Sequence, residues 1–183
     1  REYFRLLFPL ITERRIKRAI VLMGPRRVGK TVLLFHCIEK LLNDGVTPKN
    51  ICYFSIETPL YNGIALEELT KLFLDLNEKS TSEETYIFFD EIQYLKDWEL
   101  HLKSLVDSYH NIKFIVSGSA AAALKLKSRE SGAGRFTEFI LPPLTFHEFL
   151  SLTNNEYLID QYGAEERKVY QVKNIAKLNQ KFL

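Results

Sequence analysis

The sequence predicts an α/β domain in which helices cover both faces of a parallel sheet. Short apolar runs alternate along the chain with segments whose apolar residues recur at helical spacing. A glycine-rich turn joins the first apolar run directly to one of these helices. Strands that are apolar throughout are typical of parallel sheets buried on both faces, so the alternation favours an α/β sandwich. At 183 residues the chain is long enough for one such domain with a sizeable core.

The first half of the chain supplies two strands and three helices. Residues 3–18 form a mixed apolar and basic lead-in that we expect to be helical around Pro9. The first strand is expected at 19–23, and the helix after the turn should end near Asn43-Asp44-Gly45, a C-cap signal. The second strand is expected at 51–56. A helix follows at 66–76, where leucine and phenylalanine recur on one face.

The second half supplies three more strands. We expect a polar turn at 80–84 and strands at 86–89, 112–116 and 136–141, the last ended by two prolines. Trp98 should be a core anchor of a helix at 98–109. Small residues at 117–123 lead into a short helix, and 131–134 is a flexible loop. A capping box at 145–148 opens a further helix, and the charged segment 161–183 is expected to be helical.

Composition places the chain among globular proteins. Hydrophobic residues make up 46%, and 25 basic against 23 acidic residues give a net charge of +2. That balance leaves nucleic-acid binding open, because a local basic patch can exist in a nearly neutral chain. Cys37 and Cys52 lie in apolar runs, which favours buried thiols in a reducing compartment. The absence of a signal peptide or membrane-length apolar run predicts a cytoplasmic protein without membrane contact.

The glycine-rich turn fits the pattern G-x-x-x-x-G-K-[ST] of a phosphate-binding P-loop. A strand before the turn and a helix after it are the setting that this motif requires. Loop N–H groups and the positive end of the helix attract phosphate oxygens. We therefore expect Lys30 to reach the β- and γ-phosphates of a nucleotide and the Thr31 hydroxyl to bind Mg²⁺. The residues expected to bind the nucleotide are Gly24, Pro25, Arg26, Arg27, Val28, Gly29, Lys30, Thr31 and Val32.

Polar residues follow the third and fourth expected strands. Asp90 and Glu91 close the third strand, where Asp90 should hold the metal and Glu91 should act as the base that orients the attacking water. Ser117 follows the fourth strand and is expected between the carboxylates and the γ-phosphate. Arg135 ends a glycine-containing loop, which suits an arginine finger acting in cis or from a neighbouring subunit. Arg26 and Arg27 either contact phosphates or pair with acidic groups such as Glu91.

Several motifs occur together in a fixed order between residues 3 and 150, namely GPRRVGKT, YIFFDEIQYLKDWELHLKSLVD, IVSGSA, GAGRF and LPPLTFHEFL. This combination resembles the AAA+-related ATPases of bacteria and archaea, often described only as ATP-binding or AAA-domain proteins. The resemblance implies the additional-strand P-loop NTPase fold. That fold is a three-layer sandwich with a parallel five-stranded sheet of order 5-1-4-3-2.

The resemblance also implies roles residue by residue. Lys30 and Thr31 match the Walker A pair, and Asp90 and Glu91 match the Walker B pair. Ser117 falls at the sensor-1 position, where threonine or asparagine is more usual in the wider superfamily. Arg135 matches the Gly-Arg pair that precedes the fifth strand. On this basis residues 1–150 are expected to form the ATPase domain. Residues 151–183 would form a helical extension that is a lid or the start of a C-terminal effector domain.

Two functions are compatible with these motifs. The first is an ATPase that hydrolyses ATP with Mg²⁺ to drive a conformational change in an attached domain or partner. The second is a nucleotide-gated switch with little intrinsic hydrolysis, linked to a nucleic-acid-associated effector domain. A homo-oligomer is expected if Arg135 acts in trans. A GTPase is disfavoured because the base-reading motif N-K-x-D is absent, and a small-molecule kinase because no acceptor site is evident.

Overall fold

The computed structural model describes residues 2–61, 63–79, 84–119, 134–163 and 169–182. The chain forms two compact units, Arg1–Pro142 and Pro143–Leu183. The helix that the 145–148 capping box opens begins at Phe146 and belongs to the second unit, whereas the domain division expected from the sequence falls after residue 150. The expected short helix after 117–123, and most of the turn at 80–84 and of the loop at 131–134, lie outside the described residues.

The first unit is built on a five-stranded parallel sheet of order β2-β3-β4-β1-β5. Read from the opposite edge this is 5-1-4-3-2, so the predicted fold class and strand order are confirmed. Each strand begins within a residue of its expected start. The strands are β1 (Ala19–Gly24), β2 (Ile51–Ser55), β3 (Thr85–Asp90), β4 (Ile112–Ser119) and β5 (Phe136–Ile140).

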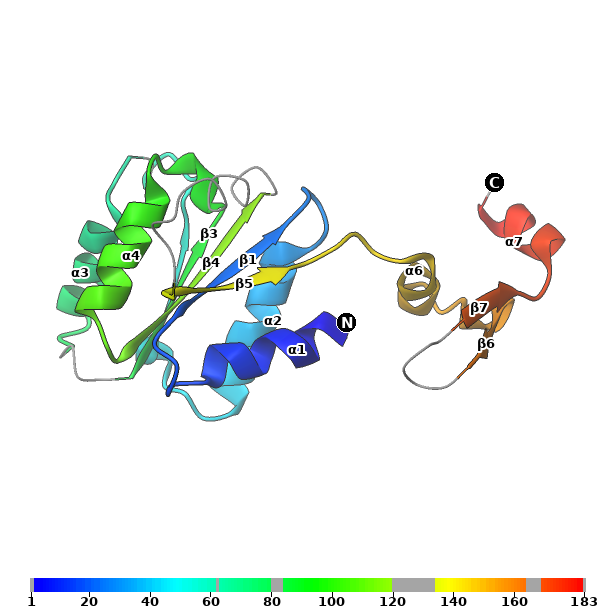
Figure 1. Cartoon of the computed structure of the whole chain (residues 1–183), viewed down its shortest axis with the longest axis horizontal. Helices are drawn as coiled ribbons and strands as arrows, with labels where there is room; N and C mark the ends of the chain where they lie inside the picture. The colour runs from blue at the N-terminus through cyan, green and yellow to red at the C-terminus, as the bar shows by residue number, and fades with distance from the viewer. Residues whose placement is uncertain (1, 62, 80–83, 120–133, 164–168, 183) are drawn as a thin grey trace. The chain divides into compact units, whose positions relative to one another are not determined.

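Two pairs of helices cover the two faces of this sheet (Figure 1). Successive side chains of a strand point to opposite faces, so β1 contributes to both cores. Ile20 and Leu22 pack in the cluster that includes residues of α1 and α2, and Val21 and Met23 pack in the one that includes α3 and α4. The helices are α1 (Glu2–Thr12), α2 (Lys30–Asn43), α3 (Leu66–Leu76) and α4 (Trp98–Ser108), with short 3-10 turns η1 (Pro48–Asn50) and η2 (Ile92–Tyr94).

Buried side chains in this core match the sequence-based expectations. Trp98, the predicted anchor of α4, is 0% exposed. Cys37 is buried and Cys52 is partly buried, and both are free thiols. Burial raises the pKa of each thiol to about 12, so both are protonated at neutral pH. Within the described ranges, no helix is both long and apolar enough to cross a bilayer.

The second unit contains a two-stranded antiparallel sheet, so the expectation of helix throughout 161–183 was wrong. Aromatic and β-branched residues favour strands, and pairing brings Ile159 opposite Val172 against Leu150 and Leu158. Thr145 and Glu148 form the predicted capping box. The elements are α6 (Phe146–Leu152), η4 (Glu156–Leu158), β6 (Ile159–Tyr162), β7 (Val169–Val172) and α7 (Ile175–Phe182).

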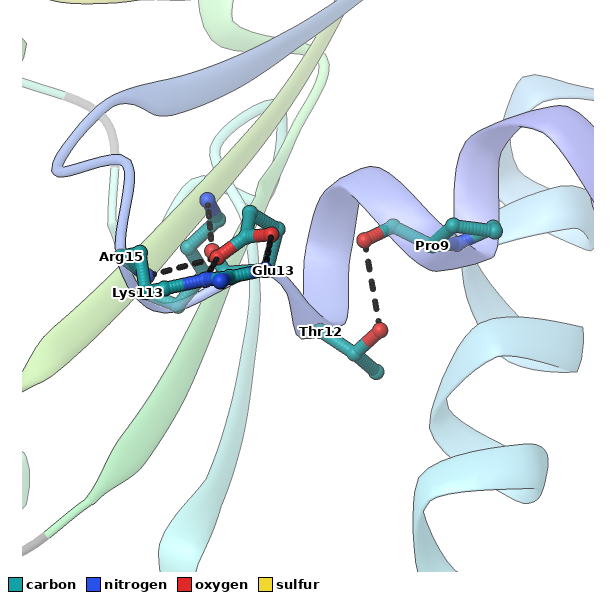
Figure 2. Close-up of polar contacts among 5 residues, drawn as sticks. All are labelled: Pro9, Thr12, Glu13, Arg15 and Lys113. Carbon is teal, nitrogen blue, oxygen red and sulfur yellow. Dashed lines mark hydrogen bonds and ion pairs between the residues drawn. The ribbon is translucent and has the colours of Figure 1, made fainter.

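A buried lysine stands at the amino end of β4 in the first unit. Lys113 is 5% exposed, and its Nζ donates a 3.0 Å hydrogen bond to the main-chain oxygen of Glu13, just after α1 (Figure 2). The carboxylate of Glu13 accepts instead from Arg15 at 3.3 Å. Burial, and then the nearby charge of Arg14, lower the pKa of Lys113 to about 8 against the opposing attraction of Glu13.

This shift predicts how stability depends on pH. The folded-state pKa of Lys113 lies below the unfolded value of about 10.4, so between these values the unfolded chain binds more protons. The destabilising contribution of Lys113 is therefore fully present below about pH 8 and is relieved as the pH rises toward 10.4. Urea unfolding of wild type and Lys113→Met should show the wild type gaining stability relative to the variant over this window. Lys71→Met, at an exposed position, is the matched control. A constant difference for Lys113→Met would contradict the prediction.

Candidate nucleotide-binding site

The strand order brings the predicted site residues to one edge of the sheet. β4 lies between β1 and β3, and the three strands are parallel, so their carboxyl ends meet. Ser117 pairs in register with Leu22, and Val116 pairs with Phe89, the residue before Asp90. The glycine-rich loop, the Asp90-Glu91 pair and Ser117 therefore gather at the carboxyl edge, which is where open α/β sheets bind ligands.

Two glycines of the loop are required by its backbone. A Cβ atom on Gly24 would overlap the carbonyl oxygen of Leu141, which follows β5. Gly29 has φ 91° and caps the amino end of α2, a conformation that glycine adopts without strain. The loop therefore turns tightly from β1 and delivers the amino end of α2, with its unpaired N–H groups, to the carboxyl edge of the sheet.

The Lys30 side chain folds back over this loop. It is 4% exposed, and its Nζ donates to the main-chain oxygens of Gly24 at 3.2 Å and Pro25 at 2.9 Å. An ammonium group held at the mouth of a loop, next to a helix amino end, is suited to an anion. Arg26 and Arg27 are exposed, and neither forms an ion pair within the described part of the chain.

Asp90 is the centre of the site. Its carboxylate is 2% exposed and accepts hydrogen bonds from four donors on four parts of the fold. Thr31 of α2 donates at 2.7 Å and Tyr53 of β2 at 2.8 Å to one oxygen. The Glu91 main-chain N–H donates at 3.0 Å, and the Ser117 hydroxyl donates, to the other. The predicted residues Thr31, Asp90 and Ser117 are therefore directly connected.

Tyr53 was not predicted from the sequence. It lies in an apolar strand, where a tyrosine is an ordinary core residue, and only the pairing of β2 with β3 places it beside Asp90. Burial, followed by the hydrogen bond to Asp90 and its charge, raises the pKa of the Tyr53 hydroxyl. The phenol is therefore a permanent donor that orients the carboxylate.

Gln93 is the second residue that sequence reasoning missed. Its amide nitrogen donates to the carboxylate of Glu91, and its amide oxygen accepts from the Ser119 N–H at 2.9 Å. Glu91 itself has φ 54°, a left-handed conformation that is uncommon for a residue with a side chain. The side chain of Glu91 is therefore held by an amide that is also anchored to the end of β4.

The structure separates Arg135 from the other predicted site residues. Arg135 precedes β5, and its main-chain oxygen accepts from the N–H of Ala19 at the start of β1. It therefore lies at the amino edge, roughly 15 Å from the P-loop along strands that rise about 3.3 Å per residue. Its Nε donates to both oxygens of Asp107, at 2.8 and 3.0 Å. A cis contact between Arg135 and a phosphate on the P-loop does not fit this arrangement, whereas action in trans stays a prediction.

The donor set at the carboxyl edge fits Mg²⁺ and a nucleotide phosphate chain. The Thr31 hydroxyl and the Asp90 carboxylate are hard oxygen ligands and lie within 2.7 Å of each other. Lys30 and the amino end of α2 supply the positive charge that phosphates require. Together they could hold a Mg²⁺–nucleotide complex at the end of β1.

Comparison with known proteins finds a matching family and several relatives. Residues 16–150 match the model of a family described as AAA domain. An uncharacterized protein of Haemophilus influenzae is 30% identical over 151 residues, which are 81% of this chain and 38% of that protein. Two uncharacterized proteins of Methanocaldococcus jannaschii, MJ1637 and MJ1544, are 37% and 36% identical over 76% and 73% of this chain. The chain spans 29% and 28% of their lengths.

The contact between Tyr53 and Asp90 generates a stability prediction. Tyr53→Phe removes one donor to a buried carboxylate and should lower the free energy of unfolding by about 1–2 kcal/mol. Urea unfolding of the nucleotide-free protein measures this loss. Tyr94→Phe, at a tyrosine that is 45% exposed, is the control and should change stability by less than about 0.5 kcal/mol. Equal effects of the two substitutions would show that the Tyr53 hydroxyl does not support Asp90.

Proposed function

Because this chain belongs to the AAA domain family, a family of nucleotide-binding, ATPase-like modules, we propose that it is a Mg²⁺-dependent ATPase. ATP hydrolysis at the carboxyl edge would drive a conformational change in an attached domain or partner. The observation that carries the proposal is the hydrogen-bond network of Asp90, which links the P-loop helix to β3 and β4. A shift of Thr31 when the phosphates bind or leave would move Asp90 and Ser117, because the three side chains are hydrogen-bonded. It would therefore reach the ends of β3 and β4.

Binding of the phosphates follows from the P-loop. The amino end of α2 and the loop N–H groups supply partial positive charge, and Lys30 supplies a full one. The hydrogen bonds of Lys30 to Gly24 and Pro25 keep its ammonium near the loop before the nucleotide arrives. Thr31 and Asp90 would hold Mg²⁺, which neutralises phosphate charge when bound. Arg26 and Arg27 are exposed and free to contact phosphates.

The proton transfer is assigned to Glu91. As the oxygen of a water molecule bonds to the γ-phosphorus, the bond from that phosphorus to the oxygen of ADP breaks. The carboxylate of Glu91 takes a proton from the water. In the structure this carboxylate accepts from the Gln93 amide, which orients it and leaves its second oxygen for the water. The Ser117 hydroxyl donates to Asp90, and this hydrogen bond would keep the end of β4 next to the γ-phosphate.

A nucleotide-gated switch is the second candidate, and the position of Arg135 favours it. If this guanidinium contributes to hydrolysis, it must come from a neighbouring copy, because its own site lies at the opposite edge of the sheet. An isolated chain would then hold ATP and hydrolyse it slowly until assembly. Both candidates use the same site and differ only in turnover.

Lys30→Ala should abolish tight binding of Mg²⁺ and ATP, because it removes the one ammonium group that the loop holds against the phosphates. Isothermal titration with a non-hydrolysable ATP analogue measures the change. Lys40→Ala, on the exposed side of the same helix, is the matched control and should bind as wild type does. Unchanged affinity of Lys30→Ala would show that the loop is not a working phosphate site.

Glu91→Gln should leave nucleotide affinity intact and reduce hydrolysis by about a hundred- to ten-thousand-fold. The amide keeps the shape of the carboxylate but cannot accept the proton. Steady-state phosphate release compares it with Glu68→Gln, an exposed position on α3 that should keep full activity. Similar turnover of Glu91→Gln and wild type would make Glu91 structural and favour the switch.

Arg135→Ala tests action in trans. If Arg135 serves a neighbouring site, wild-type specific activity should rise with protein concentration and the variant should lose this rise. Mixing Arg135→Ala with Glu91→Gln should restore part of the activity, since each supplies what the other lacks. Asp107→Asn breaks the ion pair of Arg135 and keeps the guanidinium, so it should retain the rise. Activity independent of concentration, with no recovery on mixing, would exclude the trans role.

A further inference from the structure

A basic pocket lies at the amino edge of the sheet, opposite the P-loop. Its basic lining residues are Arg14, Lys17, Arg18, His110 and Lys113. They come from the segment before β1, the end of the α4 region and the start of β4, which parallel pairing brings together at this edge. The pocket has about 20 Å³ open to a water-sized group, enough for a small polar group at the surface of a larger ligand.

In the described part of the chain, the cations of this pocket form no ion pair with a carboxylate. Glu13 attracts Lys113, but its carboxylate is paired with Arg15, and that of Asp107 is paired with Arg135. Among the described residues, none of the four pocket cations forms an ion pair with a carboxylate: Arg14, Lys17, Arg18 and Lys113. The whole chain carries a net charge of only +2, whereas every charged residue that lines this pocket is basic.

Arg14 has buried donors that lack an acceptor. Its Nη1 donates to the Asn111 main-chain oxygen at 2.9 Å, and its guanidinium lies 4.1 Å from the centre of the Tyr86 ring. The remaining nitrogens, Nε and Nη2, are buried and have no hydrogen-bond partner in the described part of the chain. Leaving such donors unsatisfied is unfavourable, so a ligand that supplies an acceptor to Nε and Nη2 would gain two hydrogen bonds.

Lys113 adds a second buried cation. Its Nζ has three hydrogens and donates one of them to Glu13, as Figure 2 shows. Its lowered pKa, to about 8, reflects burial together with repulsion from Arg14. An anion between Arg14 and Lys113 would relieve both the repulsion and the missing acceptors.

We propose that this basic pocket binds one phosphate of a nucleic-acid backbone, with neighbouring phosphates contacting Lys17 and Arg18. These two side chains are exposed beside the pocket, and Arg15 next to them is 91% exposed. A row of separate exposed cations suits a polyanion with a regular charge spacing. Guanidinium groups also match phosphate oxygens in a planar, two-point contact. Of the apolar residues that line the pocket, only Ile16 is exposed, which disfavours a protein partner with an apolar contact core.

The test uses a fluorescein-labelled single-stranded 20-nucleotide DNA, with anisotropy recorded in EDTA across a range of salt concentrations. Every protein carries Lys30→Ala, so that DNA phosphates bound at the P-loop do not contribute to the signal. The result is therefore independent of whether the protein is an ATPase. The double substitution Lys17→Ala and Arg18→Ala removes two exposed cations of the basic pocket. The control, Lys71→Ala and Lys177→Ala, removes the same charge at exposed positions elsewhere. Thermal melts verify that all proteins are folded.

The proposal predicts salt-sensitive binding by the parent protein. The pocket variant should weaken binding by about tenfold or more at 0.1 M salt, and its slope of log K against log salt should be smaller by about 1.4. The control should bind like the parent. No binding by the parent at 50 mM salt, or equal losses in the two double variants, would overturn the proposal. Tighter binding of poly-glutamate through the same residues would also overturn it and point to an acidic peptide.

Discussion

The rest of the site depends on the hydrogen bonds that the buried carboxylate of Asp90 accepts. A charge that is 2% exposed is costly unless its oxygens are satisfied, and this one accepts four hydrogen bonds. The donors come from α2, β2, β4 and the main chain after β3. Removing any of these elements would leave the charge partly unpaired. The position of Asp90 therefore couples the order of the sheet to the position of the P-loop.

Much of this could be predicted from the sequence because the signals are local. The P-loop pattern, the apolar strands and the acidic pair after β3 are all contained in short segments. Tyr53 and Gln93 could not be found in this way. Tyr53 reaches Asp90 only through the pairing of β2 with β3, and Gln93 reaches Glu91 only through the turn of η2. Neither residue type, by itself, indicates such a contact.

Strand pairing bears on two of the expectations from the sequence. A cis contact of Arg135 with the phosphate site does not fit, because a residue just before a parallel strand lies at the amino edge, whereas action in trans stays a prediction. The sequence predicts a helix over the charged segment 161–183. Cross-strand contacts of Ile159 and Val172 instead favour a hairpin, with a helix only at the end. In both cases the partner strand, and not the local sequence, decides the outcome.

We propose that Thr31 and Asp90 hold Mg²⁺ for a nucleotide bound to the P-loop. The most direct measurement is the affinity for ATP with Mg²⁺ and with EDTA, compared between wild type and Asp90→Asn by isothermal titration. The amide has nearly the shape of the carboxylate but lacks its charge. Wild type should bind ATP more tightly with Mg²⁺ than without, and Asp90→Asn should lose this difference while retaining the weaker binding. An equal gain from Mg²⁺ in both proteins would contradict the account.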